Sequence, residues 1–197
     1  PADFLIDLRN LCTERGVALV FDEIQCGLAR TGDLFAFEAS GVRPDILSLA
    51  KPLAGGLPMG AVVVAPAIAA TVQPGDHGTT FGGGPMVAGV ARAVLATVSA
   101  PAFLEGVRER AARVETALQG FREADVGIVD VRGRGLMWGI ELDRPAAPVV
   151  AAAREQGLLV CSAGASVVRL LPALNVPMEE LDQGLAILGR ILTGAVE

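Results

Sequence analysis

The sequence predicts an α/β fold with a mostly parallel sheet in residues 1–100 and a small α+β domain in residues 101–197. In the first part, short and wholly apolar runs such as Val17–Phe21 alternate with helical patterns, which is typical of a parallel sheet buried on both faces. In the second part, a long amphipathic helix precedes several short strands, which is typical of an α+β domain. Pro101 marks the expected boundary.

The first domain is expected to begin with a helix, because Phe4, Leu8 and Leu11 recur at helical spacing. Three later apolar runs have the length of strands and are bounded by glycine, proline or polar residues. The expected elements are a helix over residues 3–15, strands over 17–21, 45–50 and 60–65, a loop over 26–41, and a helix of small residues over 86–98.

The second domain is expected to begin with an amphipathic helix, in which Val107, Val114 and Leu118 share one face. The segment Arg132–Gly135 is expected to be a tight turn, because it lacks the glycine spacing of a dinucleotide-binding loop. The expected elements are helices over residues 103–124, 146–156 and 177–193 and strands over 126–131, 136–142, 157–161 and 166–171.

The composition limits the classes of function. The chain has 197 residues, of which 52% are hydrophobic, and its net charge of −6 argues against nucleic acid or an anionic membrane as a partner. No apolar stretch reaches the roughly 18 to 20 residues of a membrane helix, so we expect no membrane partner and a cytoplasmic location. Three widely spaced cysteines and a single histidine, His77, predict neither a disulfide framework nor a metal site.

Lys51 is the only lysine in the chain, whereas every other fixed cation is an arginine. Lysine can lose its proton when desolvated and form a Schiff base with a carbonyl, which arginine cannot do. Lys51 follows an apolar strand and precedes glycines, and active-site groups of open α/β sheets collect at such buried strand ends. The alternative interpretation is a solvated lysine without a chemical role.

Asp22 follows the first predicted strand in the same way. A carboxylate at a strand end, near a strand-end lysine two segments later, can hold a cationic heterocycle beside the amine. The alternative is that Asp22 caps a helix or closes a turn.

A glycine-rich segment, Asp76–Pro85, contains the hydroxyl residues Thr79 and Thr80. Glycines let backbone N–H groups approach an anion and the two hydroxyls add donors, so phosphate is the expected ligand. Glycine-rich loops without a ligand are common, and His77 alone is expected to be an ordinary loop histidine.

Arg169 lies within an otherwise apolar strand, Ser166–Leu171. A guanidinium in such a run needs a carboxylate partner, from the protein or from a substrate. The alternative is an edge strand that leaves Arg169 in solvent.

An amine, a strand-end carboxylate, an anion-binding loop and a carboxylate-binding arginine together describe a pyridoxal phosphate (PLP) site. The chain also resembles the class III aminotransferases, which have the fold type I architecture of PLP enzymes, and among them the acetylornithine aminotransferase branch. The resemblance covers essentially the whole chain. It rests on segments that occur in the family's order and spacing: Asp22–Gly32, Pro44–Lys51, Gly56–Ala61, His77–Gly83, Val131–Met137 and Arg169–Pro172.

The resemblance implies a role for each cofactor-binding residue. Lys51 is the residue that forms the Schiff base with PLP and moves the proton between substrate and cofactor. Asp22 pairs with the pyridine nitrogen, and Gln25 lies near the phenolic oxygen. Thr80, with Thr79 beside it, binds the phosphate of a cofactor held in the neighbouring subunit, which implies a homodimer with its sites at the interface.

The resemblance also implies the reaction. Arg169 binds a substrate carboxylate, and the terminal amino group of N-acetylornithine passes to 2-oxoglutarate, a step of arginine biosynthesis. Ornithine, succinylornithine, 4-aminobutyrate and other ω-amines remain open as donors. The chain matches only the carboxyl-terminal half of the family's length, so we expect one part of a longer enzyme that is not a competent catalyst alone. The alternative from another class is a non-catalytic assembly module in which Lys51 is inert.

Overall fold

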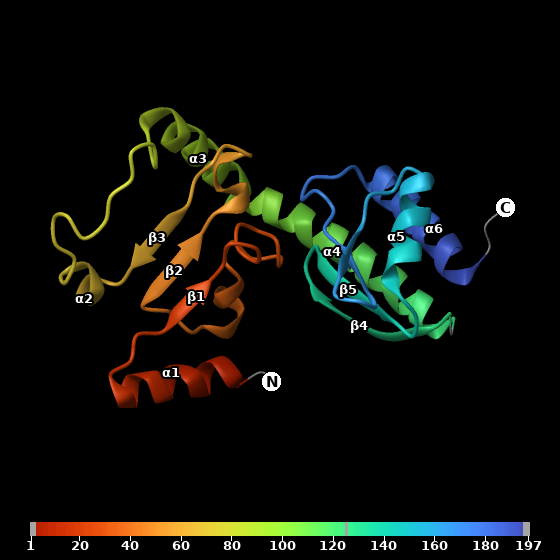
Figure 1. Ribbon diagram of the computed structural model, residues 1–197, viewed down its shortest axis with the longest axis horizontal. Coiled ribbons are helices and arrows are strands. Elements are labelled where there is room, and N and C mark those ends of the chain that lie inside the picture. Colours follow the sequence, from red (N-terminus) through yellow and green to blue (C-terminus); the bar gives the residue numbers. More distant parts are fainter. Residues whose placement is uncertain (1–2, 125, 195–197) are drawn as a thin grey trace. The chain divides into compact units, whose positions relative to one another are not determined.

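The computed structural model describes residues 3–124 and 126–194 (Figure 1). These residues form two compact units, one that runs to Pro101 and one that begins at Ala102. Each unit has a sheet of its own, with three strands in the first unit and four in the second.

The first unit contains a mixed sheet with the strand order β1-β2-β3. Strand β1 is parallel to β2, and the register pairs Val20 with Ile46 and Asp22 with Ser48. Strand β3 is antiparallel to β2. The elements, with η for a 3-10 helix, are α1 (Phe4–Arg15), β1 (Val20–Asp22), η1 (Ala36–Ser40), β2 (Ile46–Leu49), η2 (Lys51–Ala54), β3 (Ala61–Val64), α2 (Pro66–Ala69) and α3 (Pro85–Val98).

Asp45 joins α1 to the start of this sheet. Its Oδ2 accepts hydrogen bonds from the Leu19 N–H and from Arg9 Nη1, each at 2.7 Å. Its backbone N–H donates to Leu19 O at 2.8 Å, and its carbonyl accepts from the Ala65 N–H at 2.8 Å. The bond from Leu19, followed by the Arg9 guanidinium, lowers the pKa of the Asp45 carboxyl.

The first strand is shorter and more exposed than the sequence predicts. Strand β1 begins at Val20 rather than Val17, because Leu19 bonds Asp45 outside the strand ladder. Val20 is 53% exposed, so the expectation of a strand buried on both faces is wrong for the described residues. Val62, in β3, is exposed as well, which leaves apolar surface of this sheet uncovered within the unit.

Three short helices, η1, η2 and α2, were not predicted from the sequence. Each has only four or five residues, which is too short to show apolar periodicity. Pro52 lies in the first turn of η2, where its missing N–H costs no hydrogen bond. The longer helices α1 and α3 agree with their predicted ranges to within one residue.

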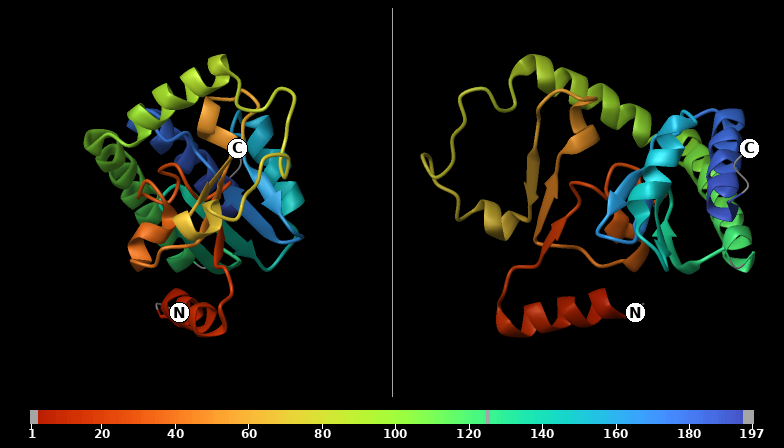
Figure 2. Two further views of the ribbon diagram at one scale, coloured as in Figure 1. Left: turned by 90° about the vertical axis from the view of Figure 1, so that its left-hand side faces the viewer. Right: turned by 45° about the vertical axis from the view of Figure 1, so that its right-hand side comes forward.

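The second unit contains an antiparallel sheet with the strand order β4-β5-β7-β6 (Figures 1 and 2). Alternate residues of β5 and β7, such as Ile140 and Val168, are fully buried. They form the core together with the apolar faces of the three helices, which supply Leu118, Ala153 and Leu188. The elements are α4 (Pro101–Glu123), β4 (Ile128–Arg134), β5 (Met137–Leu142), α5 (Ala146–Glu155), β6 (Cys161–Ala163), β7 (Val167–Leu170) and α6 (Met178–Thr193).

The predicted tight turn at Arg132–Gly135 is wrong for most of its length. Strand β4 includes the first three of these residues, and Gly133 pairs with Trp138 of β5. A Cβ at Gly133 would lie 2.5 Å from Trp138 Cδ2, so the close contact requires glycine in this strand. The turn itself consists of Gly135, with φ +59°, and Leu136.

The structure also shows the state of the thiols and candidate metal ligands. Cys12, Cys26 and Cys161 are free. No group of three or more His, Cys, Asp or Glu side chains within residues 3–124 and 126–194 could hold a metal ion. Over the same residues, no single helix is long and apolar enough to cross a membrane, although α3 and α4 together have the length and composition of a bent span.

We expect Asp45→Asn to lower the melting temperature at neutral pH, because the amide loses the charge that Arg9 binds. The folded state lowers the pKa of Asp45 below its ordinary value of 3.8, so its stabilising effect is complete above that value and is lost as the pH falls through the folded-state pKa. Melting curves of both proteins from about pH 7 down to about pH 3 should therefore converge at the acidic end.

The matched control is Asp182→Asn, which removes a surface ion pair of 2.6 Å with Arg113. Exposed pairs contribute little to stability, so its effect should be smaller at every pH. A difference between wild type and Asp45→Asn that stays constant with pH would contradict the assignment.

Candidate active site

The carboxyl ends of β1 and β2 lie at the same edge of the sheet, because the two strands are parallel (Figure 1). Asp22 is the last residue of β1, and Lys51 follows the end of β2 with one residue between. The fold therefore brings a carboxylate and the chain's one amine side chain to a common edge. Both side chains are exposed, so the expectation of a buried strand end is wrong for Lys51 in the described residues.

Two hydrogen bonds hold the Asp22 carboxylate through one oxygen. Its Oδ1 accepts from the Ile24 N–H at 2.9 Å and from Ser48 Oγ at 3.1 Å. The first bond closes a turn, as the alternative interpretation of Asp22 proposed. The second comes from the residue that pairs with Asp22 in the sheet. The described part of the chain supplies no hydrogen bond to Oδ2, which is therefore open to a ligand.

Lys51 has a left-handed backbone, with φ +42°. This region costs a residue with a Cβ about 1–2 kcal/mol. Lys51 begins η2, in which Leu53 and Ala54 are buried. The helix ends at Gly55, where a Cβ would lie 3.6 Å from Val94 Cγ2 of α3. Packing around η2 therefore holds a strained lysine at the sheet edge, and such strain is typical of functional sites.

Gln25 lies in the turn that follows β1 and is exposed, as Asp22 is. Further along this turn, Leu28 and Ala29 have φ values of +54° and +72° and are 1% and 0% exposed. The Ala29 N–H donates to Leu34 O at 3.1 Å. The backbone of the turn is thus strained and buried, while the polar side chains at its start are accessible.

Cys26 lies in the same turn, with its sulfur 3.6 Å from Asp22 O. Burial, and then the charge of Glu23, raises the pKa of the Cys26 thiol. The thiol is therefore protonated at neutral pH and is a weak nucleophile.

Sequence reasoning missed two residues of this region, Glu23 and Ser48. Glu23 is 4% exposed, and its carboxylate accepts from the N–H groups of Ala36 and Phe37, each at 2.8 Å. Burial raises the pKa of Glu23, and the two N–H bonds oppose that shift. A single polar residue in the apolar run 46–50 was a signal for Ser48. Glu23 had no local signal, because its partners lie in a different segment.

Thr79 and Thr80 lie in the long loop between α2 and α3, which is exposed throughout residues 71–83. Thr79 Oγ1 accepts from the Gly82 N–H at 3.2 Å, and a Cβ at Gly82 would collide with Thr79 Cγ2. The loop extends away from the sheet in both figures (Figures 1 and 2). Among the described residues, no hydrogen bond joins this loop to Asp22 or Lys51.

Arg169 lies in β7, which pairs with β5 through Gly139 and with β6 through Cys161. It is therefore in an inner strand, and the edge-strand alternative is wrong. Its neighbours Val168 and Leu170 are buried on the core face, so Arg169 lies on the opposite face and is half-buried. Its Nε is buried with no hydrogen-bond partner among the described residues. A carboxylate ligand would satisfy this buried donor.

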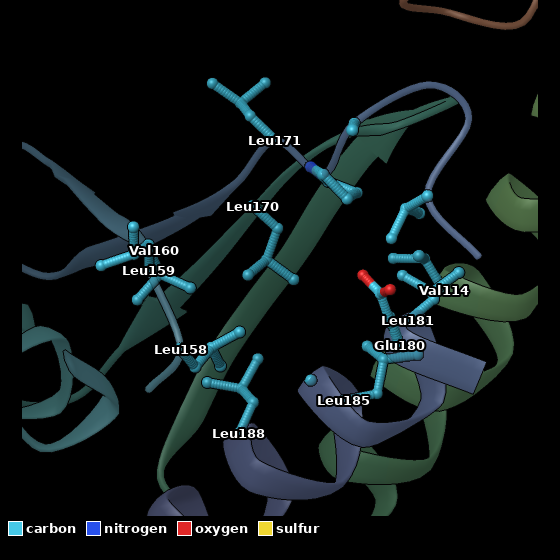
Figure 3. A pocket seen from close by; sticks show the side chains of 14 residues that line it. Val114, Leu158, Leu159, Val160, Leu170, Leu171, Glu180, Leu181, Leu185 and Leu188 are labelled. Atoms are coloured by element: carbon cyan, nitrogen blue, oxygen red, sulfur yellow. The ribbon is translucent and has the colours of Figure 1, made fainter. Parts of the chain in front are cut away.

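Cavities among the described residues lie elsewhere. One in the second unit, of about 170 Å³, is lined by apolar side chains and by Glu180, the one charged residue in its wall (Figure 3). Leu158–Val160 form part of that wall. They are not in a strand, because β6 begins at Cys161, so the strand predicted over 157–161 is wrong at its start. A second cavity, of about 640 Å³, lies between η1 and the strands β2 and β3. The candidate site is thus an open edge and not one of these cavities.

The sequence is similar to known proteins along almost its whole length. The sequence profile of the family described as aminotransferase class-III matches residues 1–192. Acetylornithine aminotransferase 1 of Bordetella bronchiseptica is 46% identical over 190 residues, which are 95% of this chain and 48% of that protein. The mitochondrial acetylornithine aminotransferase of Yarrowia lipolytica is 45% identical over 191 residues, 96% of this chain and 46% of that protein.

Solved structures agree with the sequence relatives. N-acetylornithine aminotransferase from Stenotrophomonas maltophilia matches with a TM-score of 0.87 and 36% identity over 98% of this chain and 51% of that one. Ornithine aminotransferase from Toxoplasma gondii matches with a TM-score of 0.92 and 30% identity over 98% of this chain and 47% of that one. Fold and relatives define a fold type I architecture, that of PLP-dependent aminotransferases. The chain belongs to the class III aminotransferase family, and it spans about half the length of the curated relatives it matches.

We expect Lys51→Gly to be more stable than Lys51→Ala by about 1 kcal/mol, because glycine has no Cβ to strain at φ +42°. Both variants lack the amine, so the difference reports the backbone alone. Urea unfolding of the two proteins measures it. Arg92 in α3 provides the control pair, since alanine should be the more stable residue in a helix. An alanine variant at position 51 as stable as the glycine variant would argue against strain.

Proposed function

We propose that this chain supplies the carboxyl-terminal half of a PLP-dependent aminotransferase. The observation that carries the proposal is the parallel pairing of β1 with β2, which puts Asp22 and Lys51 at one edge in a chain that matches the family along its length. The unit that runs to Pro101 is then part of the cofactor-binding domain, and the unit from Ala102 is the small domain.

PLP, when bound, supplies an electron sink for the charge that develops on the substrate carbon. Ile24 and Ser48 already occupy Asp22 Oδ1, so Oδ2 is left to accept the N–H of a protonated pyridine ring. The negative charge of Asp22 favours that protonated ring. Lys51 would provide the amine that attaches the cofactor and would then carry a proton to and from the substrate carbon. Gln25, in the turn that follows Asp22, would bind near the phenolic oxygen.

The exposed loop with Thr79 and Thr80 suits a phosphate held by a second copy of the chain. Its hydroxyls are accessible, and Gly82–Gly84 let backbone N–H groups approach an anion. Because the loop extends away from its own sheet (Figure 2), the proposed active form is a homodimer with a shared site. The proposed location is the cytoplasm.

Arg169 is the proposed partner of a substrate carboxylate, because its buried Nε lacks an acceptor. We propose N-acetylornithine as the amino donor and 2-oxoglutarate as the acceptor, in arginine biosynthesis. The support is that the curated relatives at 45–46% identity are acetylornithine aminotransferases. Ornithine is the second candidate donor, because the ornithine aminotransferase of Toxoplasma gondii matches with a TM-score of 0.92.

Borohydride reduction of the PLP-loaded full-length protein, followed by peptide mapping, should place the pyridoxyl label on the peptide that contains Lys51. We expect Lys51→Ala to lose that label and to slow transamination by roughly 10²–10⁴-fold, since the amine carries the proton. Arg92→Ala should keep both label and rate. Absence of pyridoxyl label anywhere in the wild type would support the non-catalytic assembly module instead.

A panel of amino donors assayed with 2-oxoglutarate should give the highest kcat/KM for N-acetylornithine. A higher kcat/KM for ornithine would replace the proposed donor.

Arg169→Lys should raise the KM for 2-oxoglutarate roughly tenfold, because lysine keeps the charge but cannot bind a carboxylate in a bidentate way. Arg154→Lys, at an exposed position of α5, is the control and should leave KM unchanged. An unchanged KM in Arg169→Lys would remove Arg169 from the site.

A further inference from the structure

We propose that Glu23 is a positioning residue that fixes Asp22 and Gln25 for the cofactor. The inference rests on the function proposed above for those two residues. Glu23 stands between them in the sequence, and it is buried whereas both of them are exposed.

The Glu23 carboxylate holds two consecutive backbone N–H groups at the start of η1. Its Oε2 accepts from Ala36 at 2.8 Å and its Oε1 accepts from Phe37 at 2.8 Å. Each oxygen has its own donor, so the orientation of the carboxylate is fixed. This side chain therefore ties the end of β1 to a segment more than ten residues further along the chain.

The backbone of Glu23 is fixed on both sides as well. Its N–H donates to Ser48 O at 3.0 Å, and its carbonyl accepts from the Gly27 N–H at 3.0 Å. The first bond continues the pairing of β1 with β2, and Ser48 also donates to Asp22 Oδ1. The second closes the turn that carries Gln25. One residue thus fixes the strand end, the turn and η1 together.

Gly27 shows how closely the carboxylate is enclosed. A Cβ at Gly27 would lie 2.8 Å from Glu23 Oε2 and 2.9 Å from Glu23 O. Gly27 is not among the residues with positive φ, so space and not backbone conformation requires glycine here. The next residues, Leu28 and Ala29, are buried with positive φ. Displacing the Glu23 carboxylate should therefore shift the strained turn that bears Gln25.

Glu38 provides a contrast on the same 3-10 helix. Its Oε2 accepts from the Phe35 N–H at 3.0 Å, and the side chain is exposed. This bond also caps η1, but both partners belong to the η1 segment and neither is next to Asp22. Glu38 is therefore a matched control for a capping role without a positioning role.

The test is equilibrium binding of PLP to the full-length apoprotein, for wild type, Glu23→Gln and Glu38→Gln. Glutamine keeps the size of glutamate but presents an NH₂ group to one of the two part-buried N–H donors, which then lacks an acceptor. We expect PLP to bind Glu23→Gln about tenfold more weakly and Glu38→Gln as tightly as wild type. The pH midpoint of the bound cofactor's absorption change should also move in Glu23→Gln alone, because it responds to the charge held beside the ring and not to stability.

Gly27→Ala tests the same contact independently, since its Cβ would displace Glu23 Oε2. PLP affinity should fall in this variant too. The double variant should lose less than the sum of the two single losses, because both act through one carboxylate. If Glu23→Gln does not fold, Gly27→Ala and the absorption midpoint decide the question.

The outcomes separate this inference from the proposed function. A wild type that does not bind PLP contradicts the proposed function. A wild type that binds PLP, with Glu23→Gln or Gly27→Ala equally tight and spectrally unchanged, contradicts the positioning role alone. Equal losses in Glu23→Gln and Glu38→Gln contradict it as well, because capping of η1 would then be sufficient.

Discussion

The parallel pairing of β1 with β2 is the constraint on which the candidate site depends. Because the strands run in the same direction, the segments that follow them emerge at one edge, and Asp22 and Lys51 emerge with them. The register also sets Ser48 opposite Asp22, where its hydroxyl occupies one carboxylate oxygen. An antiparallel pair would put the carboxylate and the amine at opposite edges. Asp45, through its bonds to Leu19, secures the start of this pair.

Around that edge, exposed polar side chains lie next to backbone segments that are strained or buried. Lys51, Leu28 and Ala29 all have positive φ although none is glycine. The surrounding contacts offset the cost of these conformations. The helix η2 that begins at Lys51 buries Leu53 and Ala54, and Glu23 binds η1 through its carboxylate and the turn that follows β1 through its carbonyl. The exposed side chains at this edge are therefore held by groups that are themselves buried.

The two units differ in how completely they bury their sheets. In the second unit, alternate residues of β5 and β7 are buried beneath helices, and Arg169 is left on the opposite face. In the first unit, Val20 and Val62 remain exposed. Arg169 thus lies in an inner strand of a sheet that helices cover. Lys51 instead follows a strand of a sheet that is only partly covered.

The sequence by itself determined the long elements and the residue types of the site. Helices α1, α3, α4 and α6 lie within two residues of their predicted ranges, because apolar periodicity is a local property. The only lysine and the carboxylate after an apolar run could be recognised in the same local way. Only the tertiary structure decided that Gly133 belongs to a strand, that Arg169 lies in an inner one, and that Glu23 reaches η1. These facts depend on contacts that each residue makes with other elements, which the local pattern of residues does not encode.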